Sequence, residues 1–220
     1  MEKSMIKPFI AKRVAQEFTD GMVVNLGIGL PVLCTNYLPE GIHVTVHSEL
    51  GIVGQGPAPD AEHADPMHVV DAGGSPSSVV LGGAFTDSSD SFALIRGGHV
   101  DACFLGALEV DAEGNLANWI IPGKKMPGMG GAMDLCVGAK HCIVCMEHTA
   151  KGNPKIFEKC RLPLTASHCV NKIITEMCVF EVTDKGLLMT EINPEFTVDD
   201  VKAATACPII VAEDLKSMID

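Results

Sequence analysis

Apolar and polar residues along the chain follow two kinds of spacing, one typical of helices and one typical of buried strands. Ile6, Ile10, Val14 and Phe18 recur every four residues among charged side chains, which predicts an amphipathic helix. Other helices are predicted over 31–38, 85–95 and 170–178, and after Thr197, which forms a capping-box pattern with Asp200. Short apolar runs predict strands over 22–26, 43–47, 100–108, 115–121 and 208–212, the last suited to a central strand.

The order of these elements predicts the fold class. Strands and helices alternate, and the buried strands are continuous apolar runs, which is typical of an open, mostly parallel α/β sheet flanked by helices. Two segments rich in glycine and proline, 54–68 and 122–131, are predicted to be irregular. There is no linker rich in glycine and serine and no internal repeat, so we expect one domain over residues 1–220. Functional residues are expected at the carboxyl ends of the strands.

Composition limits the kinds of partner that this chain is expected to bind. Apolar residues make up 47% of the 220 positions, enough for a large core, and the formal net charge is −12. The lysines and arginines are scattered, which argues against a nucleic-acid surface. The N-terminus lacks a hydrophobic signal core, and no apolar run approaches the 18 residues or so of a membrane span. We therefore expect no membrane partner and a cytoplasmic location.

The nine cysteines lie mostly within apolar stretches. A core of this size does not need disulfides, so we interpret them as reduced thiols that pack as small apolar side chains. Cys142 and Cys145 form a C-x-x-C pair, but no second pair stands at zinc-finger spacing, and we expect them to be strand core. The eight histidines show neither the H-x-x-E-H nor the H-E-x-x-H spacing of metal sites, so no metal site is expected.

Glu49 is the first candidate for chemistry. It follows a β-branched strand and precedes Gly51 and Gly54, so it stands at a strand-to-turn corner where a side chain can point into a crevice. A carboxylate is ionised near neutral pH and can attack a thioester without losing a proton first. The alternative, which local sequence alone favours, is a solvated glutamate on a turn.

Two glycine-rich segments are the other candidates. The run 122–134 could bring backbone N–H groups to a phosphate or an oxyanion, although it matches neither the Walker A nor the Rossmann pattern. Lys124 and Lys125 within it are either contacts to phosphates or a solvated pair. The turn 25–31 places the amide side chain of Asn25 beside Gly27 and Gly29.

Taken together, these motifs resemble a known family. The run His47-Ser-Glu-Leu-Gly-Ile-Val-Gly54, preceded by Val24-Asn-Leu-Gly-Ile-Gly-Leu-Pro31, is similar to the active-site region of the class I, 3-oxoacid type CoA transferases. Downstream runs over 91–101, 105–110, 115–119 and 127–135 resemble the same family in the same order. The likeness extends from about residue 8 to about residue 213, and the chain resembles the β subunit that carries the catalytic glutamate.

The resemblance implies a role for individual residues. Glu49 matches the glutamate that accepts an acyl group as a mixed anhydride and then holds CoA as a thioester. Asn25 matches an active-site asparagine, and Gly130 matches a glycine whose N–H helps form the oxyanion hole. Contacts to substrate or CoA are expected from the remaining site residues, Gly27, Gly29, Gly128, Gly131 and Lys124.

The resemblance also implies a fold, substrates and a partner. The fold is that of the CoA transferase and NagB–RpiA-like proteins. The substrates are acyl-CoA and short-chain acids such as acetate, butyrate or acetoacetate, with no cofactor beyond CoA itself. The partner is a CoA transferase α subunit, in a heterodimer or an α2β2 assembly.

Two departures from the family pattern stand out. The usual Ser-Glu-Asn-Gly has Leu50 in place of asparagine, and a lysine that some relatives carry near Gly74 is missing. His47 either tunes Glu49 or is a structural strand residue, and Arg96 is expected in a structural ion pair. The alternatives to a transferase are a sugar-phosphate isomerase or deaminase and a non-catalytic ligand-sensing subunit, since fold does not fix function.

Overall fold

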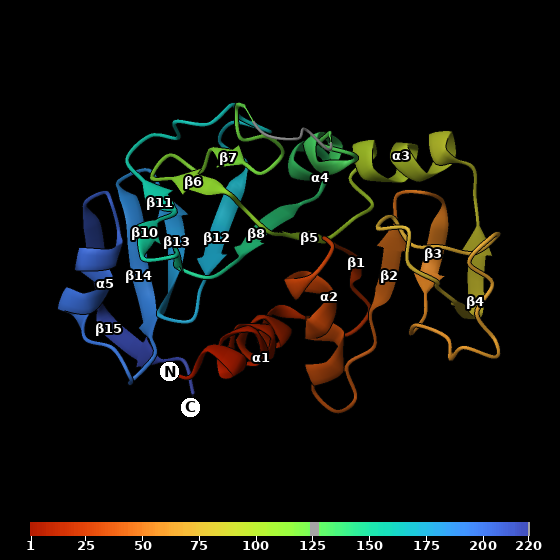
Figure 1. The fold of residues 1–220 in the computed structure, drawn as a ribbon, viewed down its shortest axis with the longest axis horizontal. Helices are drawn as coiled ribbons and strands as arrows, with labels where there is room; N and C mark the ends of the chain where they lie inside the picture. The colour runs from red at the N-terminus through yellow and green to blue at the C-terminus, as the bar shows by residue number, and fades with distance from the viewer. Residues whose placement is uncertain (124–127, 220) are drawn as a thin grey trace.

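A computed structural model describes residues 1–123 and 128–219, and a ten-stranded sheet forms its centre (Figure 1). The strands follow the order β15-β14-β13-β12-β8-β5-β1-β2-β3-β4. In chain order they are β1 (Val23–Leu26), β2 (Thr45–Ser48), β3 (Ile52–Gln55), β4 (Val79–Phe85), β5 (Ala102–Leu105), β8 (His141–Cys145), β12 (Val170–Ile174), β13 (Cys178–Thr183), β14 (Gly186–Ile192) and β15 (Ile209–Ser217).

The middle of the sheet is parallel and its flanks are largely antiparallel. Strands β12, β8, β5, β1 and β2 pair in parallel, whereas β2-β3-β4 and β12-β13-β14 run antiparallel, and β15 again lies parallel to β14. The prediction of an open, mostly parallel α/β sheet is confirmed.

The helices cover both faces of this sheet. Figure 1 shows α1 and α2 on one side and α3 and α4 on the other. The helical segments are α1 (Lys3–Val14) with the 3₁₀ turn Ala15–Glu17, α2 (Leu30–Leu33) with the 3₁₀ turn Cys34–Tyr37, α3 (Ser88–Arg96), α4 (Ala132–Gly138) and α5 (Val198–Ala204). Thr197 and Asp200 form the capping box at the start of α5 that the sequence predicted. Two small sheets complete the fold, β11 (Ile156–Phe157) with β6 (Glu109–Asp111) and β7 (Leu116–Ala117), and β9 (Thr149–Ala150) with β10 (Asn153–Pro154).

Each face of the sheet has its own core. Along β5, Ala102 and Phe104 pack with α1, while Cys103 and Leu105 pack with α3 and α4. All four side chains are at most 5% exposed. Because successive strand residues point to opposite faces, a strand covered on both sides reads as a continuous apolar run.

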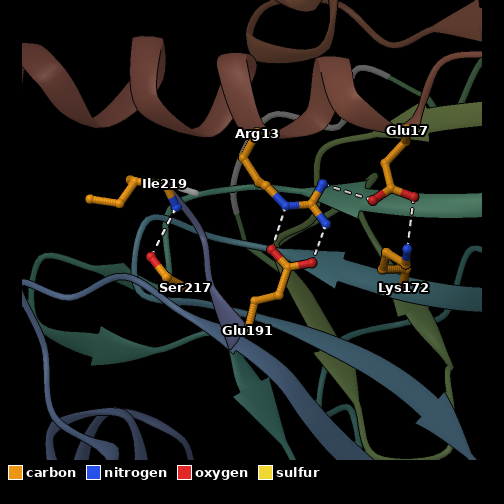
Figure 2. Close-up of polar contacts among 6 residues, drawn as sticks. All are labelled: Arg13, Glu17, Lys172, Glu191, Ser217 and Ile219. Atoms are coloured by element: carbon orange, nitrogen blue, oxygen red, sulfur yellow. Dashed lines mark hydrogen bonds and ion pairs between the residues drawn. The ribbon is translucent and has the colours of Figure 1, made fainter. Parts of the chain in front are cut away.

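A partly buried ion-pair network joins α1 to the strands beneath it (Figure 2). Arg13 is 6% exposed and donates two hydrogen bonds to the carboxylate of Glu191 on β14 and one to Glu17. Lys172 of β12 donates to the other oxygen of Glu17 across 2.7 Å. Because the buried Arg13 holds one carboxylate beside α1 and one on β14, the network fixes α1 on its face of the sheet.

The helix predicted over 170–178 is wrong. The chain forms β12 and β13 there, joined by a turn in which the Thr175 hydroxyl accepts from the N–H groups of Met177 and Cys178. The apolar residues that fit a helical period are buried residues of two strands covered on both faces, together with Met177 in the turn between them. A short strand of this kind cannot be told from a helix by periodicity alone, and the β-branched residues in 170–175 are the better signal.

Other boundaries also differ from the prediction. The run 208–212 begins β15, which is an edge strand and not a central one, with Ile210 40% exposed. The helix predicted over 85–95 begins at Ser88, because Phe85 ends the unpredicted strand β4. The strands expected over 100–108 and 115–121 are shorter, at Ala102–Leu105 and Leu116–Ala117.

The C-x-x-C residues lie in strand β8, as predicted. Cys142 packs in the core beneath α4 and Cys145 in the core beneath α1. The odd spacing along a strand sends the two side chains to opposite faces of the sheet. All nine cysteines of the chain are free thiols in the structure. Within residues 1–123 and 128–219, no helix has the length and apolar character needed to cross a membrane.

Candidate active site

Glu49 is the first residue after β2, in a tight turn that returns the chain into β3. The turn is closed by the N–H of Gly51, which donates to the carbonyl of Ser48 across 3.0 Å. Gly51 has a φ of +123°, and a Cβ there would lie 2.1 Å from the carbonyl oxygen of Thr86. Only glycine fits this position, so the turn that presents Glu49 depends on Gly51.

Three neighbouring parallel strands end beside Glu49. Strand β1 leads into Gly27 and Ile28, β2 into Glu49, and β5 into Gly106. These residues line one cavity of about 540 Å³. The cavity therefore lies at the carboxyl ends of the parallel strands, where sites in open α/β sheets are expected.

Asn25 holds the Glu49 carboxylate. It is 2% exposed and pairs in register with His47 on β2, two residues before Glu49. Its side-chain nitrogen donates to Glu49 Oε2 across 3.0 Å and to the carbonyl oxygen of His47 across 3.0 Å. One amide group thus joins the last part of β2 to the carboxylate that follows it.

His47 and Ser91 extend the hydrogen-bond network beyond Asn25. His47 is 1% exposed, and its Nδ1 lies 3.4 Å from the Asn25 amide nitrogen, while its Nε2 lies 2.9 Å from the hydroxyl of Ser91 on α3. The Ser91 hydroxyl donates to the carbonyl of Ser48 across 3.4 Å and so accepts from His47, and we therefore assign Nε2 as the protonated nitrogen of the ring. Burial lowers the pKa of His47, and the charge of Glu49 opposes this shift only in part, which favours the neutral ring.

The glycine-rich segment forms the other wall of the cavity. Gly128, Met129, Gly130 and Gly131 all line it, ahead of α4. A Cβ on Gly131 would lie 2.9 Å from Glu49 Cγ and 3.3 Å from Glu49 Oε1. The main chain therefore approaches the carboxylate more closely than any larger residue would allow.

The structure brings together most of the site residues predicted from sequence. Glu49, Asn25, Gly27, Gly128, Gly130 and Gly131 line the same cavity. Gly29 does not line it; with a φ of +92° it precedes α2 as the N-cap residue, so its role is in the turn. Lys124 and Lys125 lie outside the described residues.

Some residues at the site carried no sequence signal of their own. The cavity is also lined by Ile28, Ala72, Gly106 and Ala107. Ser91 does not line it and is linked to the site through its hydrogen bond to His47. Gly106 lay inside the strand predicted over 100–108, and the family-like run 105–110 was the one pattern that could have marked it; in the structure it directly follows β5. Leu50, which departs from the family pattern, is 53% exposed. Arg96 forms the structural ion pair predicted for it, with its Nε 2.7 Å from Asp134 Oδ1.

A second cavity of about 710 Å³ adjoins the first. The two share Ile28, Gly106 and Ala107 in their walls. The larger one is lined by four lysines, Lys3, Lys7, Lys151 and Lys155, and by the carboxylates of Glu147 and Glu176. In a chain of net charge −12, this concentration of lysines favours an anionic ligand group.

Comparisons with known proteins identify the family to which the chain is similar. A family model described as coenzyme A transferase matches residues 8–204. The chain is 53% identical to the acetate CoA-transferase subunit beta of Escherichia coli, with 96% of each chain covered. It is 48% identical to human mitochondrial succinyl-CoA:3-ketoacid coenzyme A transferase 2, covering 95% of this chain and 41% of that protein.

Solved structures show the same fold. The acyl-CoA transferase YdiF of E. coli O157:H7 superposes with a TM-score of 0.74 at 23% identity, over 96% of this chain and 43% of that one. The decarboxylase AibA/AibB superposes with a TM-score of 0.69 at 20% identity, over 96% of this chain and 88% of that one. The chain therefore belongs to the coenzyme A transferase family and is of the β-subunit type, as its motifs predicted.

Proposed function

We propose that this chain transfers CoA between a short-chain acyl-CoA and a free carboxylic acid, with Glu49 as the covalent carrier. The observation that carries the proposal is the Glu49 carboxylate held by the Asn25 amide at 3.0 Å, inside a cavity walled by residues 128–131. Fold alone would not support it, since the decarboxylase AibA/AibB has the same fold.

The reaction proceeds in two matched halves. A carboxylate oxygen of Glu49 attacks the thioester carbonyl carbon, the C–S bond breaks, and CoA leaves as a thiolate beside a mixed anhydride. The thiolate then attacks the glutamyl carbonyl carbon, releasing the first acid and forming a glutamyl-CoA thioester. The second acid attacks this thioester and the same steps run in reverse, so that Glu49 is returned as a free carboxylate.

The residues around Glu49 fit these steps. The amide of Asn25 fixes one carboxylate oxygen and leaves the other on the side of Gly131. The N–H of Gly130, in the loop that lines the cavity, supplies a hydrogen bond to the oxyanion of each tetrahedral intermediate. Water would hydrolyse both the anhydride and the thioester, so the working site must be closed to solvent.

The adjoining lysine-lined cavity fits the phosphorylated end of CoA. Its four lysines line a space that shares Ile28, Gly106 and Ala107 in its wall with the Glu49 cavity. This chain lacks the lysine that some relatives carry near Gly74. The four lysines of the cavity would supply the positive charge that binds the phosphates of CoA. The acids are expected to be small, and acetate is the first candidate because the bacterial relatives at 53% identity are named acetate CoA-transferases.

The site is completed by an α subunit. Relatives of matching length are named subunit beta, and this chain matches only 41% of the human single-chain relative. The edge strand β4 exposes Leu81 fully and Phe85 by 64%, beside the exposed Leu50. An apolar, unpaired strand edge is normally covered, and we assign this surface to the α subunit.

Steady-state kinetics test the proposal on the chain co-expressed with its α subunit. Varying acyl-CoA at several acetate concentrations should give the parallel double-reciprocal lines of a ping-pong mechanism. Glu49→Gln should lower kcat by at least about 10⁴-fold, whereas the matched control Glu213→Gln, on the exposed part of β15, should keep full activity. Intersecting lines, or an active Glu49→Gln enzyme, would refute a covalent glutamyl carrier and favour the non-catalytic alternative.

A further inference from the structure

Three cysteines that lie far apart in the sequence meet beneath α4. Cys136 comes from α4, Cys142 from β8, and Cys169 from the residue directly before β12. Their sulfur atoms all lie within 4.8 Å of one another, and those of Cys136 and Cys142 are 4.0 Å apart. None of the three lines the Glu49 cavity as the described residues form it, so the cluster is separate from the site above.

The sulfur spacing fits a three-coordinate metal ion. With a metal–sulfur distance of about 2.3 Å, three thiolates in a plane around one ion stand about 4.0 Å apart. Cys136 and Cys142 already have this separation. The other sulfur pairs, at no more than 4.8 Å, would need to close by less than an ångström. Rotation of the half-buried Cys169 side chain can supply this movement.

One of the three thiols can be reached from solvent. A bound cation would displace the thiol protons, as metal ions do when they bind thiols. Cys136 and Cys142 are at most 4% exposed, while Cys169 is half-buried and offers the path by which an ion enters.

The ligand set selects the kind of ion. It contains sulfur alone, which excludes hard ions such as Mg²⁺ and Ca²⁺ and favours soft ones. Structural zinc sites are closed by four ligands, and no fourth side chain joins this group in the described part of the chain. The neighbouring Cys103 of β5 pairs in register with Cys142 and contacts it, but its sulfur is not among those that lie within 4.8 Å of one another, and its thiol donates to the carbonyl of Leu135 across 3.5 Å.

We propose that Cys136, Cys142 and Cys169 form a three-thiolate binding site for a soft monovalent metal ion, copper(I). The site joins α4 to β8 and to the start of β12. Since α4 begins directly after the glycine segment 128–131, a bound ion would fix the base of that wall of the Glu49 cavity. This site does not depend on the transferase mechanism.

A copper(I) titration tests the proposal on the full-length chain, reduced and handled without oxygen. Copper(I) is presented at one equivalent per chain in competition with a coloured copper(I) chelator. The wild-type chain should withdraw one ion per chain and show a sulfur-to-copper charge-transfer band in the ultraviolet. X-ray absorption should find three sulfur neighbours, and the Tm should rise by at least about 4 °C.

Cysteine variants decide whether the trio is responsible. Cys142→Ser and Cys169→Ser should each weaken copper(I) binding by at least about 100-fold. Cys145→Ser is the matched control, because Cys145 is equally buried on the same strand but faces the other side of the sheet. Cys169 is half-buried, so its variant remains informative if the Cys142 variant fails to fold. Retention of copper by the chelator, equal losses in Cys145→Ser and Cys169→Ser, or preferential binding of Zn²⁺ would each overturn the assignment.

Discussion

The side-chain nitrogen of Asn25 donates to Glu49 Oε2 across 3.0 Å, and this contact links two parallel strands at the point where both end. The amide does not compete with the carboxylate for a proton, so it orients Glu49 without neutralising it. A hydrogen bond to an ionised acceptor is stronger than one between neutral groups. In the proposed mechanism, this pair would set the direction from which Glu49 attacks a substrate.

Replacing Asn25 should slow the chemical step. Asn25→Ala leaves the Glu49 carboxylate without its donor, and we expect kcat to fall about 100-fold with a smaller change in KM. Asn25→Asp should be worse, because it places a second negative charge 3 Å or so from the first. Steady-state kinetics measure both, with Asn36→Asp, an exposed asparagine on the 3₁₀ turn after α2, as control. Equal activity of Asn25→Asp and wild type would contradict an orienting role.

Ser91 should matter through His47. Ser91→Ala removes the partner of His47 Nε2, so the ring loses its fixed orientation behind Asn25, and we expect kcat to fall about tenfold with KM unchanged. Because burial lowers the pKa of His47, wild-type activity should persist through pH 6.5 or so, the ordinary histidine value, and fall only at lower pH. Because the contact with Ser91 raises the pKa of His47, the Ser91→Ala variant should lose activity at a lower pH than wild type. Superimposable pH profiles would mean that the pair is structural only.

Gly131 tests how closely the glycine segment approaches the carboxylate. Its φ of −79° is accessible to alanine, but the added Cβ would lie 2.9 Å from Glu49 Cγ and must push that side chain aside. Gly131→Ala should therefore lower kcat by at least tenfold or so while the Tm changes by no more than about 2 °C. A variant with normal turnover would show that Glu49 works from another position.

His148 predicts a pH dependence of stability. It is fully buried between the hydroxyls of Thr175 and Thr205, at 3.0 and 2.9 Å, and burial lowers its pKa from 6.5 to about 4. The unfolded chain thus binds this proton at higher pH than the folded chain does. The contribution of His148 to the free energy of unfolding is therefore complete above pH 6.5 and is lost as the pH falls toward 4. At pH 5 the free energy of unfolding should be lower by about 2 kcal/mol.

Urea unfolding at pH 7 and pH 5 measures this pH-dependent contribution of His148 to the free energy of unfolding. In His148→Gln the loss between the two pH values should shrink by about 2 kcal/mol relative to wild type. His43→Gln, at an exposed histidine, should show the wild-type difference. An unchanged pH difference in His148→Gln would place the titrating group elsewhere.

Leu81 tests the surface assigned to the α subunit. It is fully exposed on edge strand β4, so Leu81→Asp should leave the fold and Tm of the isolated chain unchanged. A charge in an apolar interface is costly, and we expect co-purification with the α subunit to fall at least tenfold. Ile219→Asp, at an exposed position beyond β15, is the control. Normal assembly of the Leu81→Asp chain would remove β4 from the interface.

Sequence predicted the fold class and the Glu49 turn because both depend on local patterns. Continuous apolar runs identified β1, β2 and β5, and Gly51 marked the corner that presents Glu49. The same patterns misread residues 170–178, where strands covered on both faces imitate a helical period.

Local sequence patterns could not predict contacts between segments that lie far apart in the chain. Ser91 reaches the site only because α3 packs above β2, and no local spacing connects it with His47. Likewise, the C-x-x-C pair drew attention to Cys142 and Cys145, whereas the fold joins Cys142 to Cys136 and Cys169. Which segments meet is decided by the order of strands in the sheet, and the sequence pattern did not supply that order.

The central claim is that Glu49 becomes covalently loaded, and the mass of its peptide tests this directly. The chain, assembled with its α subunit, is mixed with acyl-CoA in the absence of any acceptor acid, quenched in acid and digested. The peptide that contains Glu49 should gain the mass of CoA less one water, and adding acetate before the quench should remove the adduct. An unmodified Glu49 peptide in an enzyme that still turns over, or an adduct on another residue, would contradict the account.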